Sequence, residues 1–221
     1  AGNNTSFSVV ATGAGLTYQW QVNDGSGWAN LSNTGIYSDV TTATLQLTAA
    51  TTAVNTYQYR CVVSSSCTAP TNTNAATLTI NVAPAITSQP SNSTVCEGVN
   101  TSFGITASGA GITYQWEVND GSGWANVSNA GIYSGATSNT LLITAPPASA
   151  NNNQYRCIVG GTCVPGVVST AATLTVNTAP VIVTQPSGNT ICSGNTIAFI
   201  VSAAGTSLNY QWQVNDGSGW T

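Results

Sequence analysis

The chain has 221 residues and a formal net charge of −4, and only 4% of its residues are charged, against about a quarter in an ordinary soluble domain. Two arginines are its only basic residues and histidine is absent, which excludes a Ser/His/Asp triad and a histidine metal site. Nucleic acid is excluded as a partner, because its binding requires several neutralised phosphates. No apolar run reaches the roughly 18 residues of a membrane span. We therefore expect no enzyme and no cofactor.

Between residues 85 and 176, short segments with the alternating or β-branched pattern of strands are separated by Gly, Asn, Ser or Pro. In chain order they are Ala85–Thr87, Thr94–Cys96, Thr101–Ala107, Thr113–Asn119, Trp124–Ser128, Thr140–Thr144, Gln154–Val159 and Val167–Val176. No stretch has helical periodicity. The pattern predicts an all-β sandwich whose core contains Phe103, Ile105, Trp116, Tyr155 and Cys157.

The sequence repeats itself. The block Tyr18–Trp28 returns at Tyr114–Trp124 with one change, and again unchanged at Tyr210–Trp220, and both steps are 96 residues. So long a period indicates an array of whole domains, since each unit can bury its own core. We expect a first repeat at 1–82 that lacks its opening strand, a complete second repeat at 83–178, and the N-terminal part of a third at 179–221. This pattern predicts a window of a longer repetitive chain.

A glycine-rich segment, Asn119–Gly123, joins two of the predicted strands in a short hairpin, and its glycines supply the positive φ angles of a tight turn. Asp24, Asp120 and Asp216 recur in the three copies of this segment. Calcium takes about six to eight oxygen ligands with several carboxylates, and each copy offers one. We predict a structural turn and no metal site.

Two landmarks resemble immunoglobulin-like domains: Trp116 on the third strand, and Tyr155-Arg156-Cys157 at the position of the tyrosine corner and strand F cysteine. The strings TYQWEVNDGSGW, GIYSGATSNTLLIT and QYRCIVGGTC are similar to tandem immunoglobulin-like repeats of giant bacterial surface adhesins exported by the type IX secretion system. The chain departs from antibody domains in having Val9, Ile105 and Val201 where strand B carries its cysteine. The resemblance implies an extracellular, cell-surface protein of adhesion or gliding.

Each repeat carries three cysteine positions, represented in the second by Cys96, Cys157 and Cys163. Cys157 alternates inward with Tyr155, which predicts a buried thiol beside Trp116. Cys96 ends its strand and Cys163 precedes a turn, which places them at opposite poles of the sandwich. Opposite poles meet in a head-to-tail array, so Cys96 is a candidate for an interdomain disulfide with the Cys163-type residue of the next repeat, in an oxidising compartment. A bridge within one repeat and free thiols remain the alternatives.

The linkers between repeats are short. The segments Ile80–Pro84 and Thr178-Ala179-Pro180 lead directly into a strand without a Gly/Ser spacer, and proline restricts the backbone there. Stiff joints favour a structural stalk or filament whose partners are neighbouring repeats and, in a fibre, like chains. The alternative is a glycan- or protein-binding module, in which Trp28, Trp124 and Trp220 stack on a ligand. We expect Arg60 and Arg156 to form surface ion pairs.

Overall fold

The computed structural model describes residues 2–221. Contacts divide the chain into two compact units. The first unit contains residues 2–85 with the loops 108–112 and 160–166, and the second contains residues 86–107, 113–159 and 167–221. Each unit is built almost entirely of short strands, because the sequence alternates apolar and neutral polar residues and breaks every few positions at glycine, proline or asparagine.

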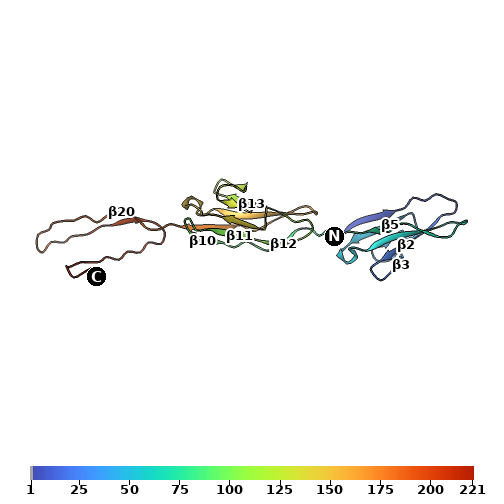
Figure 1. Cartoon of the computed structure of the whole chain (residues 1–221), viewed down its shortest axis with the longest axis horizontal. Coiled ribbons are helices and arrows are strands. Elements are labelled where there is room, and N and C mark those ends of the chain that lie inside the picture. The colour runs from blue at the N-terminus through green and yellow to red at the C-terminus, as the bar shows by residue number, and fades with distance from the viewer. Residues whose placement is uncertain (1) are drawn as a thin grey trace. The chain divides into compact units, whose positions relative to one another are not determined.

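In the first repeat, two antiparallel sheets face each other across one core (Figure 1). One sheet has the order β1-β5-β4 and the other β3-β2-β6-β7, with β8 also on β6. Their bounds are β1 Asn3–Ser8, β2 Thr17–Asn23, β3 Trp28–Asn30, β4 Tyr37–Ser38, β5 Thr44–Ala50, β6 Gln58–Ser64, β7 Thr71–Asn72 and β8 Ala76–Thr77, with a 3-10 turn at Thr52–Val54. Trp20 on β2 lies opposite Cys61 on β6 in the register of the second sheet.

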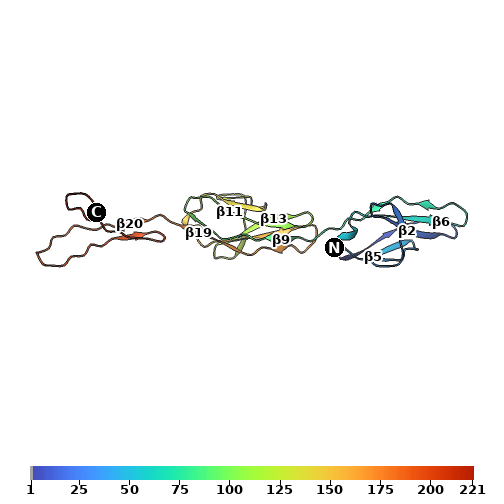
Figure 2. The same ribbon diagram turned by 90° about the horizontal axis from the view of Figure 1, so that it is seen from below.

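The second repeat has the same arrangement and adds three strands, two at its start and one after β11 (Figure 2). One sheet has the order β10-β19-β17-β13-β14, with β18 also on β17, and the facing strands are β11-β16-β15 and the pair β12-β9. The bounds are β9 Ala85–Ser88, β10 Ser93–Cys96, β11 Thr101–Gly104, β12 Thr106–Ser108, β13 Thr113–Asn119, β14 Trp124–Asn126, β15 Tyr133–Ser134, β16 Thr140–Ile143, β17 Gln154–Gly160, β18 Val167–Val168 and β19 Ala172–Asn177, with a 3-10 turn at Ala148–Ala150.

The residues expected in the core of the second repeat are buried. Phe103, Ile105, Trp116, Tyr155 and Cys157 are each at most 3% exposed. The Phe103 and Tyr155 rings stack with centroids 4.9 Å apart. Trp116 donates its indole N–H to the Ser138 carbonyl at 2.9 Å, so the polar atom of this buried ring is satisfied. Trp20 makes the matching bond to the Thr42 carbonyl in the first repeat.

Several predicted strands are shorter or interrupted. The expected segment Thr101–Ala107 is split between β11, which pairs with β16, and β12, which pairs with β9. Between them, the Ile105 N–H still donates to the Asn139 carbonyl, next to β16. Val167–Val176 is likewise split into β18 and β19. At that break the Ser169 hydroxyl accepts the Cys157 N–H and donates to the Thr170 carbonyl, replacing ladder bonds. The two-residue strand β15 was not expected from the sequence.

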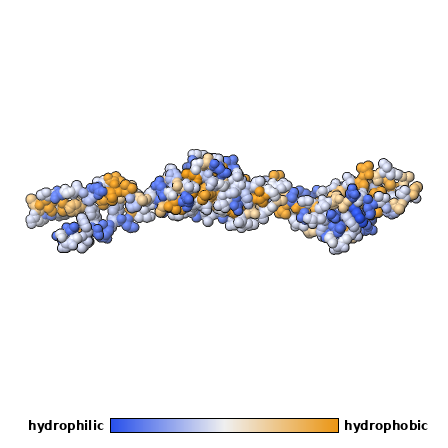
Figure 3. All heavy atoms as spheres, in the orientation of Figure 1, coloured by the Kyte–Doolittle hydropathy of each residue, from blue (hydrophilic) through white to orange (hydrophobic). Residues whose placement is uncertain are grey.

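The third repeat contributes β20, Val181–Thr184, and β21, Ser202–Ala204, which pair antiparallel. Residues whose counterparts form the cores of the other repeats are exposed here. Phe199 is 54% exposed and Trp212 is 51% exposed. Orange, hydrophobic atoms accordingly gather over the part of the chain that contains β20 (Figure 3).

Candidate functional site

The NDGSG segment forms a turn closed by its own side chains. Asn119 Oδ1 accepts the N–H groups of Gly121 and Gly123, at 2.9 and 3.1 Å. Asp120 Oδ1 accepts the Ser122 N–H at 3.1 Å, and this bond lowers the pKa of the Asp120 carboxyl. The same bonds recur at Asp24 and Asp216. One oxygen of each of these carboxylates thus closes its own turn. Among residues 2–221 no three Cys, Asp or Glu side chains gather to hold a metal.

The tryptophans after this turn are not free platforms. Trp28 and Trp124 are half-buried, and the guanidinium carbons of Arg60 and Arg156 lie 4.1 Å from their ring centroids. A guanidinium at that distance covers one face of the ring. Trp220, by contrast, is 70% exposed. In Trp28 and Trp124 one ring face is therefore covered, because alternation on β6 and β17 carries each arginine over the neighbouring ring.

The two arginines differ in their other partner. Arg156 Nε donates to Glu117 Oε2 at 2.6 Å, in an ion pair whose carboxylate side chain is only 12% exposed. Arg60 Nε donates instead to the neutral Gln21 Oε1 at 2.8 Å. The expected ion pair is present in the second repeat, whereas the first repeat has an amide at the equivalent position.

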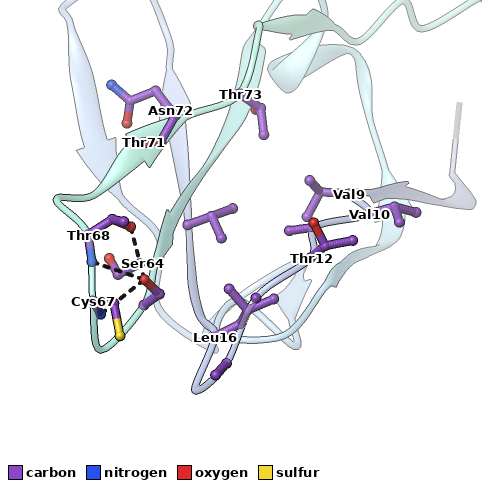
Figure 4. A pocket seen from close by; sticks show the side chains of 15 residues that line it. Val9, Val10, Thr12, Leu16, Ser64, Cys67, Thr68, Thr71, Asn72 and Thr73 are labelled. Atoms are coloured by element: carbon purple, nitrogen blue, oxygen red, sulfur yellow. Dashed lines mark hydrogen bonds between the residues drawn. The ribbon is translucent and has the colours of Figure 1, made fainter.

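A pocket of about 450 Å³ opens at one pole of the first repeat. Figure 4 shows Val9 and Leu16 on one side of the hollow, and Cys67 and Thr68 on the other. Gly13 and Ala14 belong to its wall. The lining mixes apolar residues with Ser, Thr and Asn side chains, and it contains no Asp, Glu, Lys or Arg.

In the second repeat, the residues equivalent to this wall contact the linker. A Cβ added to Gly109, the counterpart of Gly13, would lie 2.9 Å from Pro84 Cα and 3.0 Å from the Ala83 carbonyl oxygen. Ala110, the counterpart of Ala14, donates its N–H to the Val82 carbonyl at 3.0 Å and accepts the Thr162 N–H at 2.8 Å. The linker thus packs so closely against Gly109 that only glycine fits at this position.

The linker before the third repeat repeats this contact. A Cβ added to Gly205 would lie 3.0 Å from both the Ala179 carbonyl oxygen and Pro180 Cα. The Thr206 N–H donates to the Thr178 carbonyl at 3.2 Å, as the Ala110 N–H does to Val82. Thr206 Oγ1 in addition accepts the Thr178 N–H at 3.0 Å. Gly109 and Gly205 also have the same φ of +141°, so both linkers are held by one arrangement.

The cysteines differ in their exposure, and none of them takes part in the linker contacts. Cys157 and its counterpart Cys61 are buried free thiols, and burial raises the pKa of Cys157 to about 11. Cys96 is exposed at the end of β10. Cys163 is partly exposed and lines a cavity of about 240 Å³ with residues of the first repeat, all within the first compact unit. The six cysteines, all within the described chain, are free thiols in this structure.

A second hollow, of about 690 Å³, lies in the third repeat between Phe199, Trp212 and Trp220. The counterparts of the first two, Phe103 and Trp116, are 1% and 0% exposed in the core of the second repeat. The hollow is therefore lined by core positions rather than by a set of residues arranged around a ligand. In the described residues, no helix has the length and hydrophobicity to cross a membrane.

Comparisons with known proteins support the fold. The I67–I69 fragment of the titin I-band superposes with a TM-score of 0.72 at 16% identity, covering 100% of this chain and 76% of the titin chain. A variant of the same three titin domains carrying Glu-to-Ala changes gives the same values. This chain is thus an all-β protein of tandem immunoglobulin-like sandwiches.

One curated protein, endoglucanase C of Cellulomonas fimi, is 34% identical over 143 residues, which cover 63% of this chain. The matched stretch spans 12% of the length of that enzyme. No family model matches the chain.

Proposed function

We propose that these repeats form a structural, non-catalytic stalk or filament of an extracellular bacterial surface protein, which serves adhesion or gliding. The proposal treats residues 1–82, 83–178 and 179–221 as successive repeats of one array. The neighbouring repeats of the chain are its first partners, and like chains are partners if the stalks associate in a fibre. The resemblance to surface adhesins exported by the type IX system supports the location.

The observation that carries the proposal is the recurrence of the linker contact. At both linkers a backbone N–H of the following loop donates to the third residue before the strand, and a glycine with φ of +141° lies against the proline. A linker bonded in this way loses the freedom that a Gly/Ser spacer would have. Each linker is then held against a loop of the repeat that follows it by the same contacts, as expected of an array of identical domains joined by stiff linkers.

The linker contact can be tested with Gly109→Val in the 221-residue chain. The added side chain meets Pro84 and Ala83 and also strains the positive φ. We expect ¹⁵N relaxation to give one common rotational correlation time for the first and second repeats in the wild type, and two shorter, different times in the variant. Gly13→Val is the matched control, because Gly13 has a φ of +150° and a Cβ there would meet only Leu16.

Independent tumbling of the repeats in the wild type would contradict the stalk, as would equal effects of the two valine variants. Location is tested separately, by protease treatment of intact cells that produce the native protein. We expect the repeats to be removed from intact cells. Complete protection until the cells are lysed would contradict an extracellular role.

A second candidate function, carbohydrate binding, is favoured by the similarity to part of an endoglucanase. In this case the repeat displays one site beside the Arg156-capped Trp124 ring. The test is retention of the chain on insoluble cellulose and on other polysaccharides. Retention that the combined change Trp28→Ala and Trp124→Ala abolishes, while Trp220→Ala leaves it, would support this second function over the purely mechanical one.

A further inference from the structure

The residues around Cys163 are the starting point for its chemistry. Cys163 lines the small cavity of the first compact unit together with Asn3–Thr5, Ala50 and Leu78–Asn81. These residues belong to the end of the first repeat that lies opposite the pocket beside Cys67. The cavity thus places the Cys163 loop against a defined set of backbone positions.

The same positions in the second repeat surround Cys96. The residues that lie 96 positions after the cavity residues are Val99–Thr101, Pro146 and Leu174–Asn177. Cys96 is the register partner of Asn177 in the parallel β10–β19 ladder, and its carbonyl accepts the Val99 N–H at 3.0 Å. The next two residues continue the contact, because Glu97 N–H donates to Asn177 and Gly98 N–H to Pro146. Cys163 therefore lies beside residues of the first repeat whose equivalents in the second repeat are the immediate neighbours of Cys96.

We propose that Cys96 forms a disulfide with the cysteine at the Cys163 position of the following repeat, and that Cys163 pairs with the Cys96-type residue of the preceding repeat. This inference rests on the proposed array. Two thiols lose two protons and two electrons to form one S–S bond, and a small-molecule disulfide such as oxidised glutathione takes them up and leaves as two thiols. Cys61 and Cys157 stay reduced, because each is fully buried in its own core.

If the cysteines pair in this way, neither Cys96 nor Cys163 has its partner among residues 1–221. The partner of Cys163 belongs one period before Cys96, at the position that precedes Ala1, and the partner of Cys96 belongs one period after Cys163. Neither position lies within residues 1–221. This pairing consequently predicts that Cys96 and Cys163 do not pair with each other, although they belong to the same repeat.

The test supplies a partner by adding a single cysteine directly before Ala1. The added residue brings the six cysteines to seven, and after oxidation in a glutathione buffer we expect five free thiols in the denatured protein. Peptide mapping by mass spectrometry should find the added cysteine joined to Cys163. In a variant that also carries Cys67→Ser, the added cysteine should still be joined to Cys163. In a variant that also carries Cys163→Ser, every remaining thiol should stay free.

A free added cysteine, a bond from it to Cys67 or Cys96, or a Cys96–Cys163 bond in one chain would overturn the pairing. The relaxation measurement with Gly109→Val is made under reducing conditions and reports on the linker contact alone. A stiff linker with no disulfide would overturn this inference and leave the stalk intact, whereas independent tumbling under reducing conditions would count against the stalk itself.

Discussion

The guanidinium of Arg156 lies over the ring of Trp124, with its central carbon 4.1 Å from the ring centroid. The same side chain is tied at Nε to Glu117. A planar cation can satisfy both neighbours at once, because its flat face meets the ring while its N–H groups remain in the plane. The arginine thereby joins β13, β14 and β17 on the outer face of one sheet.

Replacing Arg156 with alanine should destabilise the second repeat by about 1–3 kcal/mol, because the ring loses its cation and the poorly exposed Glu117 loses its partner. Arg60→Ala should cost less, since Gln21 carries no charge that is left unpaired. Urea unfolding of both variants, followed by far-UV circular dichroism, compares the two. An equal cost would mean that the Glu117 carboxylate contributes nothing to the difference.

Trp116→Ala should cost about 3–5 kcal/mol, because the ring is fully buried and its removal leaves a large cavity and an unpaired Ser138 carbonyl. Trp212→Ala, at the equivalent position of the third repeat, removes a ring that is 51% exposed. We expect that change to cost under about 1 kcal/mol. The measurement is the same urea titration, and comparable losses for both variants would refute the assigned core.

The buried Cys157 thiol predicts a loss of stability in base. Its pKa rises to about 11 from an ordinary 9.0, because burial disfavours the thiolate. Below about pH 9 the thiol is neutral in both the folded and the unfolded chain, and its contribution is fully present. As pH rises toward 11 the unfolded chain ionises first, so about 2–3 kcal/mol is lost.

Cys157→Ala should remove this part of the pH dependence, seen as a smaller difference between unfolding free energies at about pH 8 and about pH 10.5. Cys67→Ser, which changes an exposed residue, is the control and should leave that difference unchanged. An identical pH dependence in wild type and Cys157→Ala would show that the thiol is not the titrating group.

Gly135→Ala tests a turn at which the two repeats differ. Gly135 has a φ of +76°, and a Cβ there would collide with the Thr140 carbonyl. The first repeat has Asp39 at this position with a φ of +61°. We expect Gly135→Ala to destabilise by about 1–3 kcal/mol, while Asp39→Gly changes stability by at most about 1 kcal/mol. Tolerance of alanine at 135, measured by thermal unfolding, would contradict the geometry.

The sequence allowed the core and the hairpin turn to be predicted, because both depend on local patterns. Inward alternation on the strands identified Trp116 and Tyr155, and the glycines of Asn119–Gly123 indicated the turn. Both signals are periodic or local in one strand or loop, and a single sequence contains them in full.

Contacts between distant segments were not predictable in the same way. The parallel pairing of β10 with β19 joins Cys96 to Asn177, and the wall glycine Gly109 meets Pro84 across a loop. Neither contact leaves a periodic signal in the sequence. The cover of Trp124 by Arg156 was not predicted either, because the arginine comes from a strand more than thirty positions later.

The NDGSG turn also bears on how the protein ages. An aspartate followed by glycine is prone to isomerise, because the glycine nitrogen can attack the side-chain carboxyl and close a succinimide ring. In this turn the N–H of Gly121 is engaged by Asn119 Oδ1, and Asp120 Oδ1 is engaged by Ser122. The attacking nitrogen and the carboxyl are thus both held in place while the repeat is folded. Isoaspartate accumulating at Asp24 and Asp120 would then record how long each domain has spent unfolded.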